Sequence, residues 1–267
     1  MNKSEYFFRE ERLRLITEKL IQDKKVLVPD LAKYFSVSTS SIRNDLTELE
    51  LRGLIMRTHG GAILPERMEE RIVMRKTLLQ LRDETNKAEK EAIGRAVSGL
   101  ISDGDTIMID GGSTTHFVAK NLGNVRRMIA ITTSINIFQD LFNIPDAEIY
   151  MTGGLVNREF KEMIGEIATD AISRFHPSKT IIGIDGVSIK SGLTATNPST
   201  AALKRKIVAI SEHLIVVCDH IKFNQICLLP VATIESVHTL VTDANAPLEI
   251  IDEIRKHGVE VIVAPIN

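Results

Sequence analysis

The fold of this chain is decided by residues 35–62, which read FSVSTSSIRNDLTELELRGLIMRTHGGA. Ser38 stands where a helix N-cap is expected, because its hydroxyl can accept from the first free backbone N–H groups. Gly53 suits the end of the same helix, since glycine readily takes a positive φ. Apolar residues recur between them near helical spacing, which turns one face of the predicted helix toward a core: Ile42, Leu46, Leu49 and Leu54.

Residues 55–62 predict a short hairpin after this helix, with the turn at Gly60-Gly61. A shorter helical pattern over residues 28–35 precedes it, and residues 36–38 form the turn between the two helices. Two helices joined by so brief a turn match helix-turn-helix geometry, in which the second helix lies in the DNA major groove. Polar residues at the start of the second helix lie off its apolar stripe and are expected to contact DNA: Ser38, Thr39, Ser40, Ser41, Arg43 and Asn44.

The order of these motifs resembles the DeoR family of bacterial transcription regulators. The family pattern runs F-S-V-S, I-R-R-D-L, L-E, G-L and R-x-H-G-G-A, and this chain has FSVS, IRNDL, LE, GL and RTHGGA in the same order between residues 35 and 62. Asn44 stands where the family has its second arginine. The resemblance implies a small winged helix-turn-helix domain. Arg57 and His59 are expected on its wing, touching the DNA backbone beside the helix.

Bulk composition is that of an ordinary soluble protein of 267 residues, with 43% hydrophobic and 25% charged residues. Residues 1–64 hold eleven Lys/Arg and nine Asp/Glu, for +2, which leaves −4 in the rest of the −2 total. This asymmetry has the sign expected of a DNA-binding end, but it is small. No apolar run has the roughly 20 residues of a membrane span, and the N-terminus has no secretory signal. We therefore expect a cytoplasmic protein, with Cys218 as a buried thiol in an apolar run.

Three regions are expected along the chain. Residues 1–64 form the DNA-binding domain, with a first helix over 7–22 and residues 26–28 as the third strand of the wing. Residues 65–86 are crowded with charges of both signs and predict a linker. Residues 87–267 form the third region, a sensor and oligomerisation domain.

Helices and apolar strands alternate from Lys87 onward. This alternation predicts an α/β domain with a mainly parallel sheet and helices on both faces. Within it, a helix is expected near residues 163–175, and residues 185–187 are expected to be a loop after a strand.

Polar loops follow several of the predicted strands. Because ligands of open α/β sheets bind at the carboxyl ends of strands, these loops are candidates for one site. Glycines admit a ligand to the backbone, hydroxyls donate, and a helix start favours an anion, so a phosphorylated sugar is the expected occupant. The loops span residues 110–115, 132–134, 152–154, 185–187 and 219–222.

Residues 87–242 also resemble the DeoR-family sensor domain, which is similar in fold to ribose-5-phosphate isomerases. The resemblance implies a phosphate loop D-x-G-[ST]-T-T at residues 110–115, a glycine pair, a helix lysine at Lys204 and a D-x-x-K-F motif at 219–223. The effector-binding residues expected from the loops and the resemblance together are Asp110, Gly112, Ser113, Thr114, Thr115, Thr133, Gly153, Gly154, Asp185, Lys204, Asp219 and Lys222.

The leading interpretation is a DNA-binding regulator, a repressor of carbohydrate metabolism, controlled by a phosphorylated sugar and without a cofactor. One base-reading arginine is worth ~1–3 kcal/mol, so a dimer or tetramer on repeated half-sites is expected. The alternative is a sugar-phosphate isomerase with a DNA-binding head, using Asp185 or Asp219 as base and Lys204 or Lys222 as electrophile. A metal-dependent regulator is disfavoured, because no His/Cys pair has ligand spacing.

Overall fold

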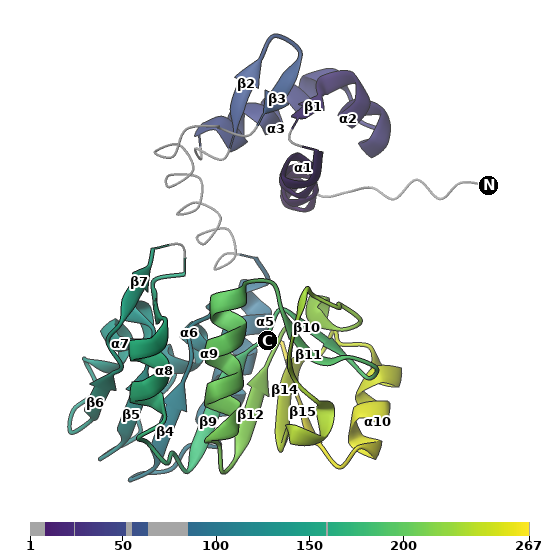
Figure 1. The fold of residues 1–267 in the computed structure, drawn as a ribbon. Helices are drawn as coiled ribbons and strands as arrows, with labels where there is room; N and C mark the ends of the chain where they lie inside the picture. The colour runs from purple at the N-terminus through teal and green to yellow at the C-terminus, as the bar shows by residue number, and fades with distance from the viewer. Residues whose placement is uncertain (1–8, 24, 52–54, 64–84, 159, 267) are drawn as a thin grey trace. The chain divides into compact units, whose positions relative to one another are not determined.

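The computed structural model describes residues 9–23, 25–51, 55–63, 85–158 and 160–266. Contacts between residues divide the chain into an N-terminal unit, residues 1–82, and a C-terminal unit, residues 83–267 (Figure 1). Gly53, Leu54 and all of the predicted linker except its last two residues lie outside the described residues.

The described residues of the N-terminal unit form three helices followed by a hairpin, in the order that the sequence predicts (Figure 1). Strand β1 pairs antiparallel with β3, and β3 pairs with β2, so the segment before the second helix is the third strand of the wing. The elements are α1 (Arg9–Asp23), β1 (Lys25–Leu27), α2 (Val28–Phe35), α3 (Thr39–Leu51), β2 (Met56–Thr58) and β3 (Gly61–Ile63).

The predicted hairpin turn at Gly60-Gly61 is wrong by one residue, because the turn is His59-Gly60 and Gly61 opens β3. Gly61 lies opposite Leu27 in the ladder, and a Cβ there would come 1.9 Å from the carbonyl oxygen of Val26. The close approach of β1 therefore requires a glycine inside the strand rather than in the turn.

A single apolar core joins the helices of the N-terminal unit to its wing. The stripe predicted for α3 is fully buried, with Ile42, Leu46 and Leu49 at 0% exposure. Helix α2 ends where Ser36 takes a left-handed conformation (φ 55°). Helix α3 begins after Ser38, whose Oγ accepts from the Ser41 N–H at 3.1 Å, as an N-cap should.

The C-terminal unit is a seven-stranded sheet in the order β15-β14-β12-β9-β4-β5-β6, and every neighbouring pair in it is parallel. Its strands are β4 (Thr106–Ile109), β5 (Ile129–Thr132), β6 (Glu148–Met151), β9 (Lys179–Gly183), β12 (Leu214–Val217), β14 (Thr239–Asp243) and β15 (Glu260–Ala264). Its helices are α5 (Lys87–Ser98), α6 (Ser113–Lys120), α7 (Ile135–Leu141), α8 (Glu166–Ile172), α9 (Pro198–Ala209) and α10 (Leu248–Lys256).

Helices cover both faces of this sheet, as the alternation of elements predicts. Residues of α5, α6 and α7 share one apolar cluster with one face of the strands, and residues of α8, α9 and α10 share the other. Successive residues of β4 alternate between the clusters, with Ile107 and Ile109 on the first face and Met108 on the second. Figure 1 shows α8 and α9 in front of the sheet and α5 and α6 behind it.

Short strands outside the main sheet correct two of the predictions. Residues 155–164 form a hairpin of β7 (Leu155–Asn157) and β8 (Glu162–Ile164), so the helix expected near residues 163–175 starts only at Glu166. The expected loop at 185–187 is wrong for its last two residues, which begin β10. The small sheet consists of β10 (Gly186–Ser188), β11 (Gly192–Ala195) and β13 (Leu229–Ala232), with turns η1 (His220–Lys222) and η2 (Ile234–Ser236) nearby in the chain.

Cys218 is 1% exposed, as expected for a buried thiol. Burial raises the pKa of the Cys218 thiol. None of the helices in the described part of the chain combines the length and apolar character needed to cross a membrane.

Candidate functional site

The first turns of α3 present polar side chains to solvent. Thr39, Ser40, Arg43 and Asn44 are exposed, while Ser41 is half-buried and shares a hydrogen bond with the Ser38 hydroxyl, Oγ to Oγ 2.9 Å. The Arg43 guanidinium makes no hydrogen bond or ion pair with any residue that the structure describes. Its five donors are therefore available to a ligand.

Hydrogen bonds join the wing to the second half of α3. The Arg57 backbone N–H donates to Glu50 Oε1 at 3.0 Å, and its guanidinium donates to Thr47 Oγ1 at 2.9 Å. Thr47 lies one helical turn after Arg43, so these contacts place the Arg57 side chain on the same helix surface as Arg43. His59 is exposed in the hairpin turn.

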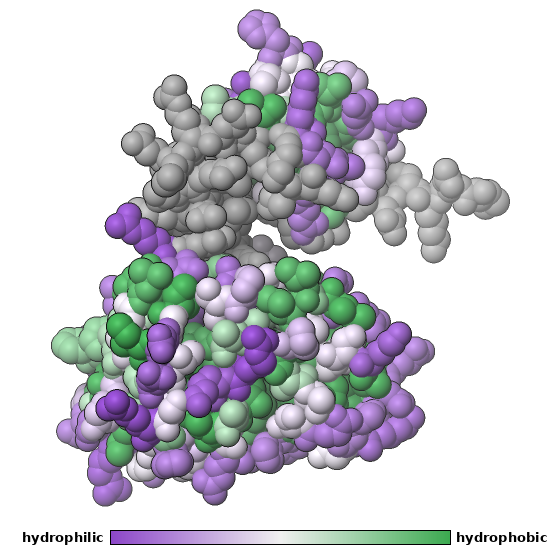
Figure 2. All heavy atoms as spheres, in the orientation of Figure 1, coloured by the Kyte–Doolittle hydropathy of each residue, from purple (hydrophilic) through white to green (hydrophobic). Residues whose placement is uncertain are grey.

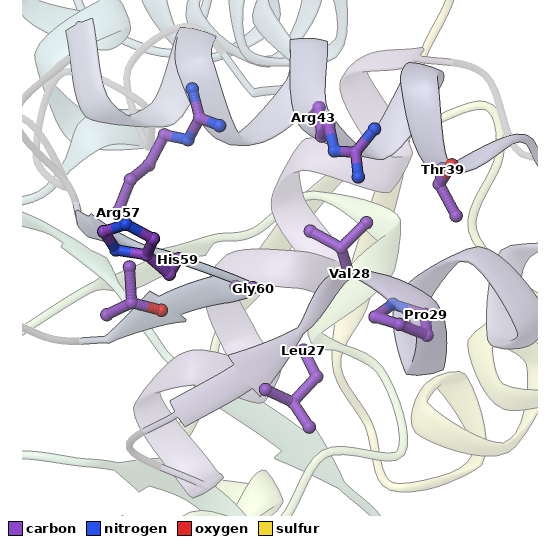
Figure 3. A pocket seen from close by; sticks show the side chains of 10 residues that line it. Leu27, Val28, Pro29, Thr39, Arg43, Arg57, His59 and Gly60 are labelled. Carbon is purple, nitrogen blue, oxygen red and sulfur yellow. The ribbon is translucent and has the colours of Figure 1, made fainter.

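A pocket of about 430 Å³ lies between the start of α3 and the wing. Figure 3 shows Thr39 and Arg43 contributed by the helix, Arg57, His59 and Gly60 by the hairpin, and Leu27, Val28 and Pro29 from the β1–α2 segment. Of the predicted DNA-binding residues, Thr39, Arg43, Arg57 and His59 therefore line one pocket with two arginines, and Ser38, Ser40, Ser41 and Asn44 do not line it.

Asp45, inside the IRNDL motif, has a role that the sequence reasoning missed. It is 1% exposed and forms an ion pair with Arg12 of α1, Arg12 Nε to Asp45 Oδ2 2.5 Å. A second hydrogen bond joins Arg12 Nη2 to Asp45 Oδ1 at 3.2 Å. This bidentate pair fixes α3 to α1 and leaves the solvent face of α3 to other residues.

Each of the five predicted loops of the C-terminal unit begins at the carboxyl end of a strand of the parallel sheet, or within two residues of it. Because the strands are parallel, the loops lie at the same edge of the sheet. Along the order of the strands, the edge carries Asp219 after β12, Asp185 after β9, Asp110 after β4, Thr133 after β5 and the Gly153-Gly154 pair after β6. The structure therefore provides the common edge that the sequence predicts.

Asp110 and Lys204 form the centre of this edge. Asp110 is 0% exposed and Lys204 4%, and their side chains form an ion pair. Asp110 Oδ1 also accepts from the Gly183 N–H at 3.0 Å, and Lys204 Nζ donates to the Gly183 carbonyl at 2.9 Å. Lys204 is thus not a solvated helix lysine, because it joins α9 to the ends of β4 and β9.

The lysine keeps its positive charge in this buried position. Burial lowers the pKa of Lys204, but the carboxylates of Asp110 and Glu162 more than offset it, so the pKa is raised. The carboxylate of Asp185 acts in the same direction. Asp185 is half-buried and accepts from the N–H and the hydroxyl of Thr196, each at 2.9 Å.

Glu162 of β8 belongs to the same cluster and was missed by the sequence reasoning. It is 1% exposed, and its Oε1 accepts from Thr133 Oγ1 at 3.0 Å and from the Gly111 N–H at 3.3 Å. Burial, opposed by Lys204, raises the pKa of Glu162 to about 7. Nothing in its sequence context, EFKEM, distinguishes it from an exposed acid.

The loop from Asp110 to Thr115 leads directly into α6. Gly112 is the N-cap and provides no side-chain cap, so the first N–H groups of α6 have no side-chain partner among the described residues. Ser113 is half-buried, and Thr114 is 7% exposed. Thr115 is fully buried, and its hydroxyl donates to the Gly112 carbonyl at 3.1 Å. The amides at this helix start suit an anion.

The remaining predicted residues lie outside this hydrogen-bonded cluster. Gly153 and Gly154 have φ of 73° and 112°, and a Cβ on Gly154 would come 2.9 Å from the Ile164 carbonyl oxygen. Asp219 accepts from Asn86 Nδ2 at 3.1 Å, and its other oxygen is buried without a hydrogen-bond partner in the described part of the chain. Lys222 is half-buried in η1.

Residues 85–158 and 160–266, with the described residues of the N-terminal unit, contain no group of three His, Cys, Asp or Glu side chains suited to a metal ion. The C-terminal site offers an ion pair, hydroxyl groups and the N-terminus of a helix. These features can hold an anionic polyol.

Comparison with known proteins identifies both units. Residues 12–68 match the DeoR-like helix-turn-helix domain, and residues 85–244 match the DeoR C terminal sensor domain. A ribose 5-phosphate isomerase from Plasmodium falciparum superposes with 17% identity over 51% of this chain and 52% of its own, at a TM-score of 0.38, which is too low to support an inference about chemistry.

Curated relatives match nearly the whole chain. The glycerol-3-phosphate regulon repressor of Escherichia coli K12 is 33% identical over 92% of this chain and 95% of its own. The HTH-type transcriptional repressor GlcR of Bacillus subtilis is 31% identical, over 96% of each chain. A putative aga operon transcriptional repressor of Escherichia coli O157:H7 is 30% identical over 95% and 93%. These names are those of transcriptional repressors and not of enzymes, which favours the regulator over the isomerase. The chain therefore belongs to the DeoR family of transcription regulators.

Proposed function

We propose that this protein is a cytoplasmic repressor of a carbohydrate-metabolism operon. It binds operator DNA with α3 and the wing, and a phosphorylated sugar at the strand edge of the C-terminal unit controls that binding. The observation that carries the proposal is the exposed Arg43 guanidinium, which has no partner among the described residues and lines one pocket with the wing.

Base contacts are assigned to Arg43 and Asn44, whose side chains suit guanine and adenine edges in the major groove. The hydroxyls of the preceding turn and the wing residues contact phosphates and fix the register of the helix. The full proposed set is Ser38, Thr39, Ser40, Ser41, Arg43, Asn44, Arg57 and His59.

A homodimer or homotetramer is part of the proposal. One arginine supplies only ~1–3 kcal/mol of base discrimination, so two copies of α3 on half-sites about one helical turn apart are needed. Exposed apolar side chains of the C-terminal unit, some of them visible as hydrophobic areas in Figure 2, suit contacts between subunits. They are Leu155, Val156, Ile167, Ile226, Leu228 and Leu248.

The effector is proposed to place its phosphate on the amides and hydroxyls of residues 112–115. Lys204, held by Asp110, supplies positive charge beneath it, and Thr133 supplies a further hydroxyl. The polyol part would follow the edge in either direction, toward Gly153-Gly154 or toward Asp185, Asp219 and Lys222. The name of the glycerol-3-phosphate regulon relative supports a phosphorylated effector.

The experiment begins with the full-length protein and a library of random DNA duplexes. Repeated selection is expected to enrich one sequence that contains two half-sites. The affinity of the protein for this duplex should fall steeply as the salt concentration rises, because phosphate contacts release counterions. A thermal-shift screen against pentose, hexose and triol phosphates is expected to find a stabilising ligand. Failure to enrich any sequence would contradict the DNA-binding part, and isomerisation of the stabilising ligand would support the enzyme.

A further inference from the structure

Glu162 places a carboxylate where the proposed effector anion would bind. Its Oε1 accepts the Gly111 N–H at 3.3 Å and the Thr133 hydroxyl at 3.0 Å. Thr133 is one of the donors that the proposed function assigns to the anion, and Gly111 directly precedes the assigned residues 112–115. A Cβ on Gly111 would lie 2.9 Å from the same oxygen, so the carboxyl group packs directly against the loop.

Backbone hydrogen bonds join β8 to the loop that follows β5. The Met163 N–H donates to the Thr133 carbonyl at 2.8 Å, and the Ile135 N–H donates to the Lys161 carbonyl at 2.9 Å. Ile164, two residues on, is part of the apolar core. The residues on either side of Glu162 are therefore bonded to the residues after β5, and its carboxyl group lies between Gly111 and Thr133.

The charges around Glu162 make an additional anion costly. Lys204 from α9 and Asp110 from the end of β4 act on its carboxyl group, and they already form an ion pair with each other. The acids of α8, Glu166 and Asp170, are exposed. With Asp185 acting on the pair as well, the cluster holds three carboxyl groups against one lysine.

This inference rests on the proposed function and adds a specificity-determining residue to it. We propose that Glu162 controls which charge the effector can carry, such that an anionic group binds beside Gly111 only when the Glu162 carboxyl has taken up a proton. In the protonated form the carboxyl group is a hydrogen-bond donor, and it can donate to an oxygen of the anion instead of repelling it.

The size of the effect follows from the proton affinity of the free site. With the pKa of Glu162 at about 7, the carboxyl group is mostly protonated at about pH 6 and mostly ionised at about pH 8.5. Only protein with a protonated Glu162 can bind the anion, and at the higher pH this form is a small fraction of the protein. The apparent affinity for a dianion is therefore expected to fall about 30-fold between these two pH values.

Sulfate is the suitable probe, because it remains a dianion across this range, whereas phosphate esters titrate within it. Calorimetric titration of the full-length protein with sulfate at the two pH values should show the 30-fold fall. Glu162→Gln, which keeps the shape and removes the titration, should bind with equal affinity at both. Glu166→Gln, an exposed acid four residues away, is the matched control and should behave as the native protein.

A second measurement needs no variant. The heat of sulfate binding at about pH 8, measured in two buffers with different ionisation enthalpies, reports proton uptake and is expected to give about one proton per sulfate. Saturable binding with no proton uptake and no pH dependence would overturn the role of Glu162 and leave the proposed effector site standing. No saturable binding by the native protein or by Glu162→Gln at either pH would overturn the anion site itself.

Discussion

The two candidate sites differ in how their polar side chains are bonded within the fold. On α3, Thr39, Ser40, Arg43 and Asn44 are exposed, and the core beneath them is complete without them. At the sheet edge, the buried pair Asp110 and Lys204 is bonded together and to the Gly183 backbone, and the buried Glu162 accepts from the Gly111 N–H and the Thr133 hydroxyl. Substitutions on α3 should therefore change binding and spare stability, whereas substitutions at the sheet edge should change both.

The largest expected effect is on Lys204. Lys204→Met removes the cation from a buried ion pair and leaves Asp110 buried without it, which should lower the free energy of unfolding of the C-terminal unit by ~3–5 kcal/mol. Urea unfolding of the full chain, with hydrogen exchange of the β9 and β12 amides to assign the transition, measures this. Lys190→Met, an exposed lysine in the turn between β10 and β11, is the control. A stability equal to that of the control would show that the buried pair contributes nothing.

Next in size is the pH dependence of stability caused by Glu162. Its folded-state pKa of about 7 lies above the ordinary glutamate pKa of 4.5, so the folded state binds the proton more tightly than the unfolded state. Stability from this group is complete below the unfolded pKa and is lost as the pH rises through the folded pKa, a loss of roughly 3 kcal/mol. The difference in stability between native protein and Glu162→Gln, measured at intervals across this range, should follow that curve. A difference that does not vary with pH would contradict it.

Arg43→Ala tests the exposed side of the comparison. It should cost ~1–3 kcal/mol of operator binding per half-site, measured by fluorescence anisotropy on the selected duplex. Its stability should stay within about 0.5 kcal/mol of the native value, because the side chain is exposed and unpaired among the described residues. Lys33→Ala, an exposed basic residue on α2 outside the pocket, should change neither. An unchanged footprint of Arg43→Ala on the operator would count against α3 as the recognition helix.

The smallest expected effect is on Ser38, which is exposed like the other polar residues at the start of α3 but also has a structural role. Ser38→Ala removes the N-cap of α3 and should destabilise the N-terminal unit by ~1 kcal/mol. Ser40→Ala, in the same turn, makes no side-chain hydrogen bond to a described residue and should leave stability unchanged. Hydrogen exchange of the α3 amides distinguishes the two variants. Equal protection in both would show that Ser38 does not cap the helix.

Much of the fold could be predicted because its signals are local. The stripe of Ile42, Leu46 and Leu49, the cap at Ser38 and the alternation of strands and helices after Lys87 all lie within short stretches of sequence. Strands of four residues such as β4 (TIMI) and β12 (LIVV) could be predicted from their apolar runs. The hairpin at 155–164 and the small sheet of β10, β11 and β13 were missed, because strands such as β8 (EMI) and β10 (GVS) are as short and have no such run.

The interior of the proposed effector site could be predicted only in part, because its contacts join residues far apart in the sequence. Lys204 came from the family resemblance, and its partner Asp110 lies 94 residues away in sequence. Glu162 depends on a hairpin that leaves no local signal, and Asp45 depends on Arg12, 33 residues away. Pairings of this kind arise from tertiary packing, which local patterns do not record.

Control of the N-terminal unit by the C-terminal unit is the central claim, and one measurement tests it directly. Operator affinity of the full-length protein should be measured with and without a saturating amount of the stabilising sugar phosphate. A useful switch requires the ligand to change the operator affinity about a hundredfold, or ~2.7 kcal/mol. Because the coupling is reciprocal, operator DNA must then change the affinity for the sugar phosphate by the same factor. Identical operator affinities with and without saturating ligand would contradict the account.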